Sequence, residues 1–422
     1  MKAWIISADM GYGHQRAAYA LKKIVNDKII SIGTDEISSP FVKKKWSRLQ
    51  NTYEFVSRNK KMPIWGKYLY KLMNNLQSIK PFYPKKDRSK INLPVKILEK
   101  YISEGLYDNL KELISDKNLP ILTTFYAPAI ALELFGFENI YSIVTDADIN
   151  RVWVPKNPSE SKIKYFVPSE IAYERIKQYG IPEKNIIYTG FPIDIEEINF
   201  LNKSTVEERL VKRLVKLDPM GKFRKNHSGS VEKVLNINLE NIQADNKIIL
   251  TFAVGGAGAQ KEIAKKIISG LDYELQSGKF KLNLIAGTRI EVKQYFENIT
   301  KDLNENSFSI IYCETKEKYF SEFNKVIGET DILWTKPSEL VFYTALGLPL
   351  ILAPAIGAQE VANRRWLRDD ICSGIVQNKP KYASQWIGDL LNSGRLAEAA
   401  WLGYLKTEQN GVNNIINFLF GG

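Results

Sequence analysis

One local pattern occurs twice in this sequence of 422 residues: a buried strand, a glycine-rich turn and an amphipathic helix. These three parts lie at 2–8, 9–14 and 15–25 in the first copy, and at 247–252, 255–258 and 260–271 in the second. The pattern opens a doubly wound α/β domain, where backbone N–H groups at the helix start favour an anion or a polar ligand group. Two copies predict two such domains, with a ligand cleft between their facing carboxyl edges. The length also exceeds what one hydrophobic core usually supports.

The segment between the two copies has a different composition. Residues 218–247 contain Gly221, Gly229 and many Asn and Lys, which predicts a mobile insertion. The apolar spacing of Val412, Ile415, Ile416 and Leu419 predicts a last helix packed back on a domain. The expected organisation is an N-terminal domain over 1–197, a linker and mobile insertion over 198–247, a C-terminal domain over 248–405 and a final helix over 406–422.

The stretch from Leu340 to Ala358 has nineteen residues without a charge, long enough to span a bilayer. Two glycines and two prolines interrupt it, and lipid offers no water for the backbone groups that they would free. We therefore expect a short helix from Ser338, capped by its hydroxyl, and then a buried strand over 350–353. Gln359, Glu360 and Asn363 follow at the carboxyl end of that strand, where open α/β sheets bind ligands.

The composition is that of a soluble globular enzyme, with 44% hydrophobic and 25% charged residues. Cys313 and Cys372 are the only cysteines, which argues for a reducing compartment and against a disulfide framework. With two histidines in the whole chain, we expect no metal site. The apolar run after Lys2 is too short for a signal peptide, so a cytoplasmic location is expected.

The net charge of +12 is concentrated in one basic, aromatic segment over 41–100. This segment has 16 Lys and Arg against three acidic residues, a net charge of +13, and nine aromatic residues. Within it Trp65, Lys67, Tyr68 and Lys71 belong to an amphipathic helical pattern that is typical of a helix lying on an anionic membrane surface. The alternatives are a core helix with a solvated face, and nucleic-acid binding, which no recognition motif supports.

The first glycine-rich turn has a histidine at the start of its helix. The helix dipole keeps such a His14 neutral and therefore available as a base. In the alternative interpretation His14 hydrogen-bonds a loop carbonyl. Two glycines alone are weak support for a nucleotide, and a structural turn explains them equally well.

Six motifs, spread over most of the chain outside 218–247, occur in the order seen in monogalactosyldiacylglycerol synthases and bacterial diacylglycerol glucosyltransferases. They are DMGYGH at 9–14, VTD at 144–146 with Trp153 after it, TGFPI at 189–193, VGGAG at 254–258, TKP at 335–337 and GAQEVAN at 357–363. The sequence thus resembles that family and, more distantly, the GlcNAc transferase that makes lipid II. The resemblance implies a GT-B fold: two Rossmann-like domains, the first binding acceptor and the second nucleotide sugar.

The resemblance also implies roles for individual residues. It implies catalytic roles for His14, as the base for the acceptor hydroxyl, and for Asp9. Acceptor binding falls on Gly11, Tyr12, Gly13 and Asp146. Donor binding falls on Gly255, Gly256, Gly258, Gly287, Lys336, Ser338, Gln359, Glu360 and Asn363. No metal or other cofactor is needed, because a base, hydrogen bonds on the diphosphate and polar groups on the sugar suffice.

One motif departs from the family. Where the family has T-K-P-G-G-L-T-I-A-E-A, this chain has TKPSELVFYTA, so Ser338 and Glu339 replace two glycines and Thr344 replaces the glutamate that binds ribose. A carboxylate beside a diphosphate repels it by roughly 1 to 4 kcal/mol at 4 Å. Either the donor lies differently, or its nucleotide is not uridine diphosphate, or the site does not turn over.

The expected function is an inverting glycosyltransferase that transfers a hexose from a nucleoside diphosphate sugar to a diacylglycerol-like lipid. Its expected place is the inner face of the cell membrane, as a peripheral protein whose partners are nucleotide sugar, lipid acceptor and anionic surface. The alternatives are a UDP-sugar epimerase of the same fold, for which the basic segment has no use, and a GT-B protein that binds sugar nucleotide without catalysis.

Overall fold

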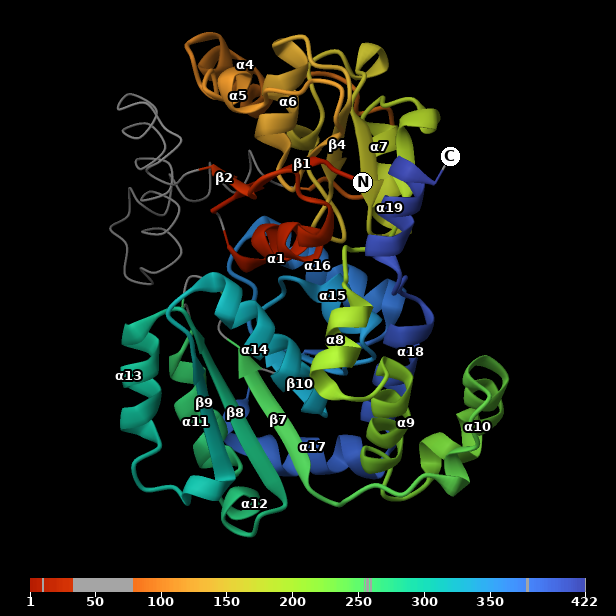
Figure 1. The fold of residues 1–422 in the computed structure, drawn as a ribbon. Helices are drawn as coiled ribbons and strands as arrows, with labels where there is room; N and C mark the ends of the chain where they lie inside the picture. The colour runs from red at the N-terminus through yellow and green to blue at the C-terminus, as the bar shows by residue number, and fades with distance from the viewer. Residues whose placement is uncertain are drawn as a thin grey trace. The chain divides into compact units, whose positions relative to one another are not determined.

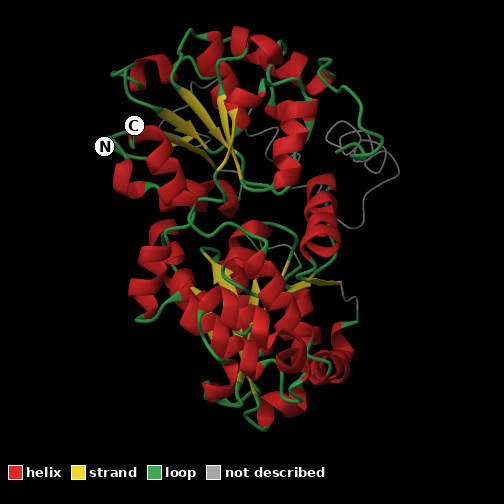
Figure 2. Cartoon of the chain, turned by 90° about the vertical axis from the view of Figure 1, so that its right-hand side faces the viewer, coloured by secondary structure: helices red, strands yellow, loops and turns green. Residues whose placement is uncertain are grey.

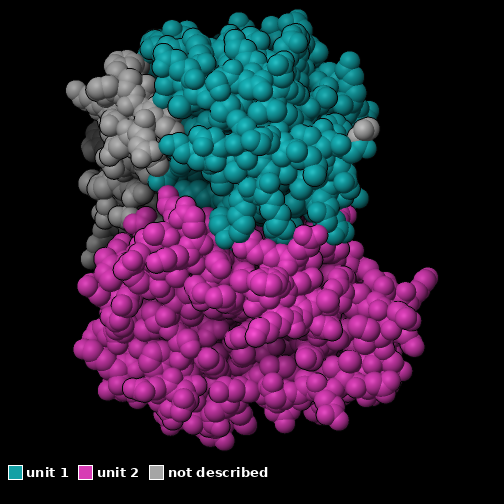
Figure 3. Space-filling model, viewed as in Figure 1, with its two compact units in different colours: residues 1–194, 356–363, 410–422 teal, residues 195–355, 364–409 magenta. Residues whose placement is uncertain are grey.

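The computed structural model describes residues 1–9, 11–32, 79–253, 255, 258, 260–376 and 379–421. The chain forms two compact units (Figure 3). Unit 1 contains residues 1–194, 356–363 and 410–422, and unit 2 contains 195–355 and 364–409. The last two segments of unit 1 therefore come from the part of the sequence assigned above to the C-terminal domain and the final helix.

Unit 1 is built on a parallel six-stranded sheet in the order β2-β1-β3-β4-β5-β6. Its strands are β1 (Trp4–Ala8), β2 (Ile30–Ile32), β3 (Ile121–Thr123), β4 (Ile140–Ile143), β5 (Lys164–Val167) and β6 (Ile186–Tyr188). The chain passes from β1 to β2 on one side and then returns to β3 on the other side of β1. The strand order therefore reverses between β1 and β3, the place where such sheets bind ligands.

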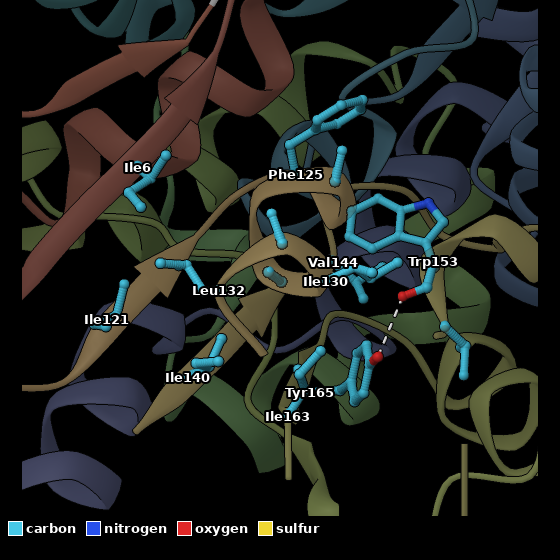
Figure 4. Close-up of a cluster of buried hydrophobic side chains, with 14 of the residues drawn as sticks. Ile6, Ile121, Phe125, Ile130, Leu132, Ile140, Val144, Trp153, Ile163 and Tyr165 are labelled. Carbon is cyan, nitrogen blue, oxygen red and sulfur yellow. Dashed lines mark hydrogen bonds between the residues drawn. The ribbon is translucent and has the colours of Figure 1, made fainter. Parts of the chain in front are cut away.

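Helices enclose both faces of this sheet (Figures 1 and 2). The helices of unit 1 are α1 (Tyr12–Ala20), α4 (Leu93–Ser103), α5 (Leu110–Leu113), α6 (Tyr126–Leu134), α7 (Glu170–Gln178), the first part of α16 (Ala358–Arg365) and α19 (Gly411–Phe420), with 3-10 turns η1 (Lys22–Ile24), η2 (Arg151–Trp153), η3 (Pro158–Glu160) and η4 (Glu183–Asn185). Alternate β1 residues face opposite ways: Trp4 and Ile6 belong to one buried cluster and Ile5 to the other. Figure 4 shows the first cluster, which includes Ile6 and Trp153. The predicted terminal helix is α19, whose Val412 and Ile415 pack in the second cluster.

Unit 2 repeats this architecture with a parallel sheet in the order β12-β11-β10-β7-β8-β9. Its strands are β7 (Ile248–Ala253), β8 (Phe280–Gly287), β9 (Phe308–Tyr312), β10 (Ile332–Thr335), β11 (Leu350–Leu352) and β12 (Gly374–Val376). Its helices are α8 (Ile195–Asn202), α9 (Val206–Lys216), α10 (Lys222–Leu235), α11 (Glu262–Gly270), α12 (Asp272–Gln276), α13 (Ile290–Ile299), α14 (Lys316–Glu329), α15 (Leu340–Ala345), α17 (Ala383–Asn392) and α18 (Arg395–Leu405), with the π-helix η7 (Trp366–Ile371) and 3-10 turns η5 (Leu239–Asn241), η6 (Glu305–Ser307) and η8 (Pro380–Tyr382). Here the strand order reverses between β7 and β10.

The segment expected to be a mobile insertion contains an ordered helix, α10, and belongs to unit 2. The carboxylate of Asp218 accepts hydrogen bonds from the backbone N–H groups of Phe223 and Arg224, at 3.0 and 2.9 Å, and so caps the helix start. Phe223 and Val231 are buried on its inner side. The segment thus contains a helix with two apolar anchors two turns apart, and its mobility stays a prediction.

The uncharged stretch 340–358 forms the predicted short helix and buried strand, α15 and β11. In the described part of the chain, no helix has both the length and the apolar character needed to cross a membrane. The predicted cap is wrong in one detail: Glu339, in a left-handed conformation, and not Ser338, precedes the helix, without a side-chain capping bond.

Candidate functional site

The first glycine-rich turn connects β1 to α1 at the point where the strand order of unit 1 reverses. Gly11 precedes the helix with φ 113°, a backbone conformation that side chains disfavour. Tyr12, the first helical residue, is buried, and Gly13 lies in the first turn. The turn therefore places His14 beside the carboxyl ends of β3 and β4.

His14 lies against two residues that follow those strands. Its Nδ1 is 2.5 Å from the carbonyl oxygen of Thr124 and 3.1 Å from Oγ1 of Thr145. A carbonyl oxygen can only accept a hydrogen bond, so Nδ1 carries the proton. In the neutral ring, the lone pair that can accept a proton is then on Nε2. The alternative interpretation, a hydrogen bond from His14 to a loop carbonyl, is therefore present in the structure. The same bond favours the tautomer with the proton on Nδ1, which a base acting through Nε2 needs.

Asp9 is held within the same turn. Its backbone N–H donates to the carbonyl of Ile32 at 3.1 Å, and its Oδ1 accepts a 2.6 Å hydrogen bond from Nε2 of the buried Gln15. Both contacts connect the end of β1 to neighbouring elements. The structure thus places Asp9 and His14 in one turn, as their spacing in the sequence requires.

Aromatic side chains surround the His14 ring. The ring centroids of His14 and Phe125 are 5.2 Å apart in an edge-on arrangement, and Trp153 is 6.5 Å away. Tyr126 packs on Trp153 at 5.5 Å, and burial raises the pKa of its hydroxyl to about 12. Figure 4 shows Phe125 and Trp153 at the end of the buried cluster. Phe125 and Trp153 are both buried, so the His14 ring packs against the apolar core on this side.

The turn after β4 contains the predicted Asp146. Its Oδ1 accepts a 2.9 Å hydrogen bond from Nδ2 of Asn363, whose Oδ1 accepts from the backbone N–H of Ala147 at 3.3 Å. Gln359 donates to the carbonyl of Asp148. Three residues expected in two different binding sites therefore contact each other within unit 1.

The same turn is fixed to α7 by a buried ion pair. Arg175 donates to both carboxylate oxygens of Asp148 at 2.9 Å, and both side chains are almost fully buried. Burial lowers the pKa of Arg175, but the hydrogen bonds and charge of Asp148 outweigh this effect and raise it. Arg175 therefore stays charged, and its ion pair with Asp148 fixes the turn to α7.

The side chain of Glu360 forms a hydrogen bond at the N-terminus of α16. Its Oε2 accepts a 2.8 Å hydrogen bond from the backbone N–H of Ile356, four residues earlier. Gln359, Glu360 and Asn363, the three predicted residues of this helix, all lie in the 356–363 segment of unit 1. The three were predicted to contact the donor sugar, and that role stays a prediction.

The second glycine-rich turn follows β7, where the strand order of unit 2 reverses. Gly255 has φ 71°, and a Cβ there would lie 2.5 Å from Cε and 3.5 Å from Nζ of Lys336. The lysine of the TKP motif thus lies across the glycine backbone, which brings a positive charge to the turn. Gly258 has φ 63°, and a Cβ there would lie 2.9 Å from Cγ2 of Val292. Gly256 lies outside the described residues, and Gly287 ends β8 with φ 65°.

The residues that depart from the family motif follow β10. The backbone N–H of Ser338 donates to the carbonyl of Lys336 at 2.7 Å. Glu339 has φ 55° and is 7% exposed, and the hydroxyl of Tyr343 donates to its Oε2 at 3.4 Å. The fully buried Thr344 donates its hydroxyl to the carbonyl of Leu340 and accepts from Thr407 at 3.1 Å. Thr344 thus connects α15 to the turn that follows α18.

The predicted membrane residues Trp65, Lys67, Tyr68 and Lys71 lie outside the described residues. Among the residues that are described, no group of three or more His, Cys, Asp or Glu could hold a metal ion. Motif reasoning missed Thr124, Phe125 and Tyr126, and it gave no role to Thr145, although the VTD motif contains this residue. The available signal was positional, because all four follow the ends of β3 and β4.

Comparison with known proteins identifies distant relatives. The chain is 21% identical over 394 residues to the processive diacylglycerol β-glucosyltransferase of Bacillus subtilis, covering 92% of this chain and 86% of that protein. It is also 21% identical to the protein of the same name from Bacillus pumilus, covering 94% and 88%. No protein-family profile matches.

Two solved structures have a similar fold. A Listeria monocytogenes protein described as a UDP-N-acetylglucosamine 2-epimerase is 12% identical with a TM-score of 0.54, covering 100% of this chain and 98% of that one. The UDP complex of MnaA from S. aureus is 11% identical with a TM-score of 0.50, covering 99% and 95%. The fold is GT-B, as predicted, and the chain is a distant homologue of diacylglycerol β-glucosyltransferases.

Proposed function

We propose that this protein is an inverting glycosyltransferase, which transfers a hexose from a nucleoside diphosphate sugar to the hydroxyl of a diacylglycerol-like lipid. The observation that carries the proposal is the bond between His14 Nδ1 and the Thr124 carbonyl, which leaves Nε2 as the proton acceptor. The matches to diacylglycerol glucosyltransferases over most of both chains support the same reaction class.

In the proposed reaction His14 acts on the acceptor. The acceptor oxygen attacks the anomeric carbon opposite the diphosphate, His14 Nε2 takes the hydroxyl proton, and the bond from the anomeric carbon to the diphosphate oxygen breaks with its electron pair on that oxygen. Attack from the opposite face inverts the anomeric configuration. Phe125 and Trp153 pack against the His14 ring and hold the base in place.

The donor is assigned to unit 2. Gly255 and Gly258 have positive φ values in the turn after β7, and the Lys336 ammonium lies across Gly255. Backbone N–H groups and a cation stabilise the negative charge that develops on the leaving diphosphate. The resemblance adds Gln359, Glu360 and Asn363 as partners of the donor sugar.

The proposed place of action is the inner face of the cell membrane. The net charge of +13 over 41–100, with nine aromatic residues, favours attraction to anionic lipid. A surface enzyme of this kind meets its lipid acceptor without a membrane-spanning helix.

The test is an assay of the purified protein with radiolabelled UDP-glucose, UDP-galactose or UDP-GlcNAc and diacylglycerol in mixed vesicles. We expect a glycolipid product from one of these donors, and His14→Gln should reduce its rate at least about 10²-fold without changing nucleotide affinity. Epimerised donor without glycolipid would support the epimerase alternative. Nucleotide binding without any product would support the non-catalytic one.

A further inference from the structure

The turn after β4, residues 145–149, is held from two sides. On one side, α7 contributes the Arg175 ion pair and Ser169, whose hydroxyl donates to the carbonyl of Ala147 at 2.5 Å. On the other side, Gln359 and Asn363 come from a segment more than 200 residues later in the chain. Both sets of contacts lie within unit 1.

Asn363 bonds to this turn in two directions. Its amide nitrogen donates to the Asp146 carboxylate at 2.9 Å, and its amide oxygen accepts from the Ala147 N–H at 3.3 Å. Asn363 is only 2% exposed, so these bonds form away from bulk water. An amide has both the donor and the acceptor that this arrangement needs. An aspartate keeps the acceptor but places a second carboxylate against Asp146.

The turn reaches His14 through Thr145. Thr145 precedes Asp146 directly, and its Oγ1 is 3.1 Å from His14 Nδ1. Thr124, the other partner of Nδ1, is fixed separately, because its N–H donates to the β1 residue Ile6 at 2.9 Å. A displacement of the turn therefore changes one of these two contacts at Nδ1 while the other is retained.

We infer that Asn363, assisted by Gln359, is a positioning residue for His14, acting through the turn of Asp146 and Thr145. This inference rests on the proposed function, in which His14 is the base. It gives Asn363 a role on the acceptor side of the reaction, whereas the family resemblance gives it a donor-sugar contact. The two roles predict different kinetics: loss of positioning lowers kcat, and loss of a donor contact raises the KM for the donor.

The first measurement needs no substrate. His14 and His227 are the two histidines of the chain, so ¹³C-histidine NMR gives two ring signals that His227→Gln assigns. Asn363→Asp should change the chemical shifts of the His14 ring and the midpoint of its titration. His227 stacks on Phe223 at 4.9 Å in unit 2, and its signals should stay unchanged.

The matched control is Asn414→Asp. Asn414 also donates its amide to unit 1, to the Thr189 carbonyl at 3.0 Å, but this bond lies on α19 and not at the 145–149 turn. It should leave the His14 signals at their wild-type positions. Gln359→Glu, which removes the bond to the Asp148 carbonyl, is the second test variant should Asn363→Asp fold poorly.

In the transfer assay, Asn363→Asp should lower kcat at least tenfold with the donor KM within about twofold, and Asn414→Asp should do neither. Unchanged His14 signals in both Asn363→Asp and Gln359→Glu would overturn the inference, and a raised donor KM alone would make Asn363 a donor ligand. Absence of transfer by the wild-type protein would overturn the proposed function instead, and the NMR comparison would still decide whether Asn363 positions His14.

Discussion

Replacing Glu339 should strengthen the binding of uridine diphosphate. Glu339 occupies a position where the family that this sequence resembles has glycine. It lies between Lys336 and α15, its φ is 55°, and its side chain is 7% exposed. If a phosphate approaches its carboxylate to about 4 Å, repulsion costs roughly 1 kcal/mol at the dielectric of water and about 4 kcal/mol at an effective value of 20. Glu339→Ala removes this charge, so we expect the Kd for uridine diphosphate to fall at least about fivefold.

The backbone contributes separately to the effect. A left-handed residue with a Cβ costs about 1 to 2 kcal/mol, whereas glycine adopts this conformation readily. Glu339→Gly should therefore exceed Glu339→Ala in the free energy of unfolding by about 1 kcal/mol. Glycine at 339 should also match or exceed alanine in nucleotide affinity.

Isothermal calorimetry with uridine diphosphate, and urea unfolding followed by circular dichroism, measure these two effects. Glu291→Ala is a suitable control, because Glu291 is exposed and bonds Arg289 at the surface. The reasoning is refuted if both Glu339 variants bind uridine diphosphate more weakly than wild type, because Glu339 would then be a ligand of the nucleotide.

Three further predictions follow from the structure and the sequence. Asp148→Ala should destabilise the protein by about 3 to 5 kcal/mol in urea unfolding because it leaves the buried Arg175 unpaired, and a loss below 1 kcal/mol would contradict this. The free energy of unfolding should fall as the pH rises from about 10 to 12, because Tyr126 has a pKa of about 12 in the folded state and near 10 in the unfolded chain. Tyr126→Phe should reduce this dependence of the unfolding free energy on pH in alkaline unfolding curves. The protein should sediment with anionic vesicles at low salt and dissociate as salt rises, since polybasic attraction is screened over about 10 Å at 0.1 M; equal binding to neutral vesicles would return residues 65–76 to the core-helix interpretation.

Much of the fold was predictable because its signals are local. A run of buried residues, a glycine turn and a helical apolar spacing lie close together in the sequence, and they occur at the first strand of each unit. The glycines and prolines between 346 and 358 likewise predict α15 and β11 correctly. Local composition did not predict a helix at 218–247, where Phe223 and Val231 are the buried residues of α10.

The candidate site was predictable only in part. Motifs pointed to Asp146, Gly255 and Lys336, which follow the ends of strands, and to His14 in the first turn of α1; their roles stay predictions. They did not identify Thr124, which is 110 residues from His14 in the sequence and selects its tautomer. A backbone carbonyl contact leaves no trace in residue type, so no motif could contain it.

The sequence by itself therefore determined most of the strands and helices and the two glycine-rich turns, because neighbouring residues decide these features. Tertiary structure alone decided which strand ends meet. The crossover connections place β3 beside β1 and β10 beside β7, and this brings Thr124 to His14 and Lys336 to Gly255. It also brought Asn363 to Asp146, since hydrogen bonds between residues 217 positions apart form only after the chain has folded.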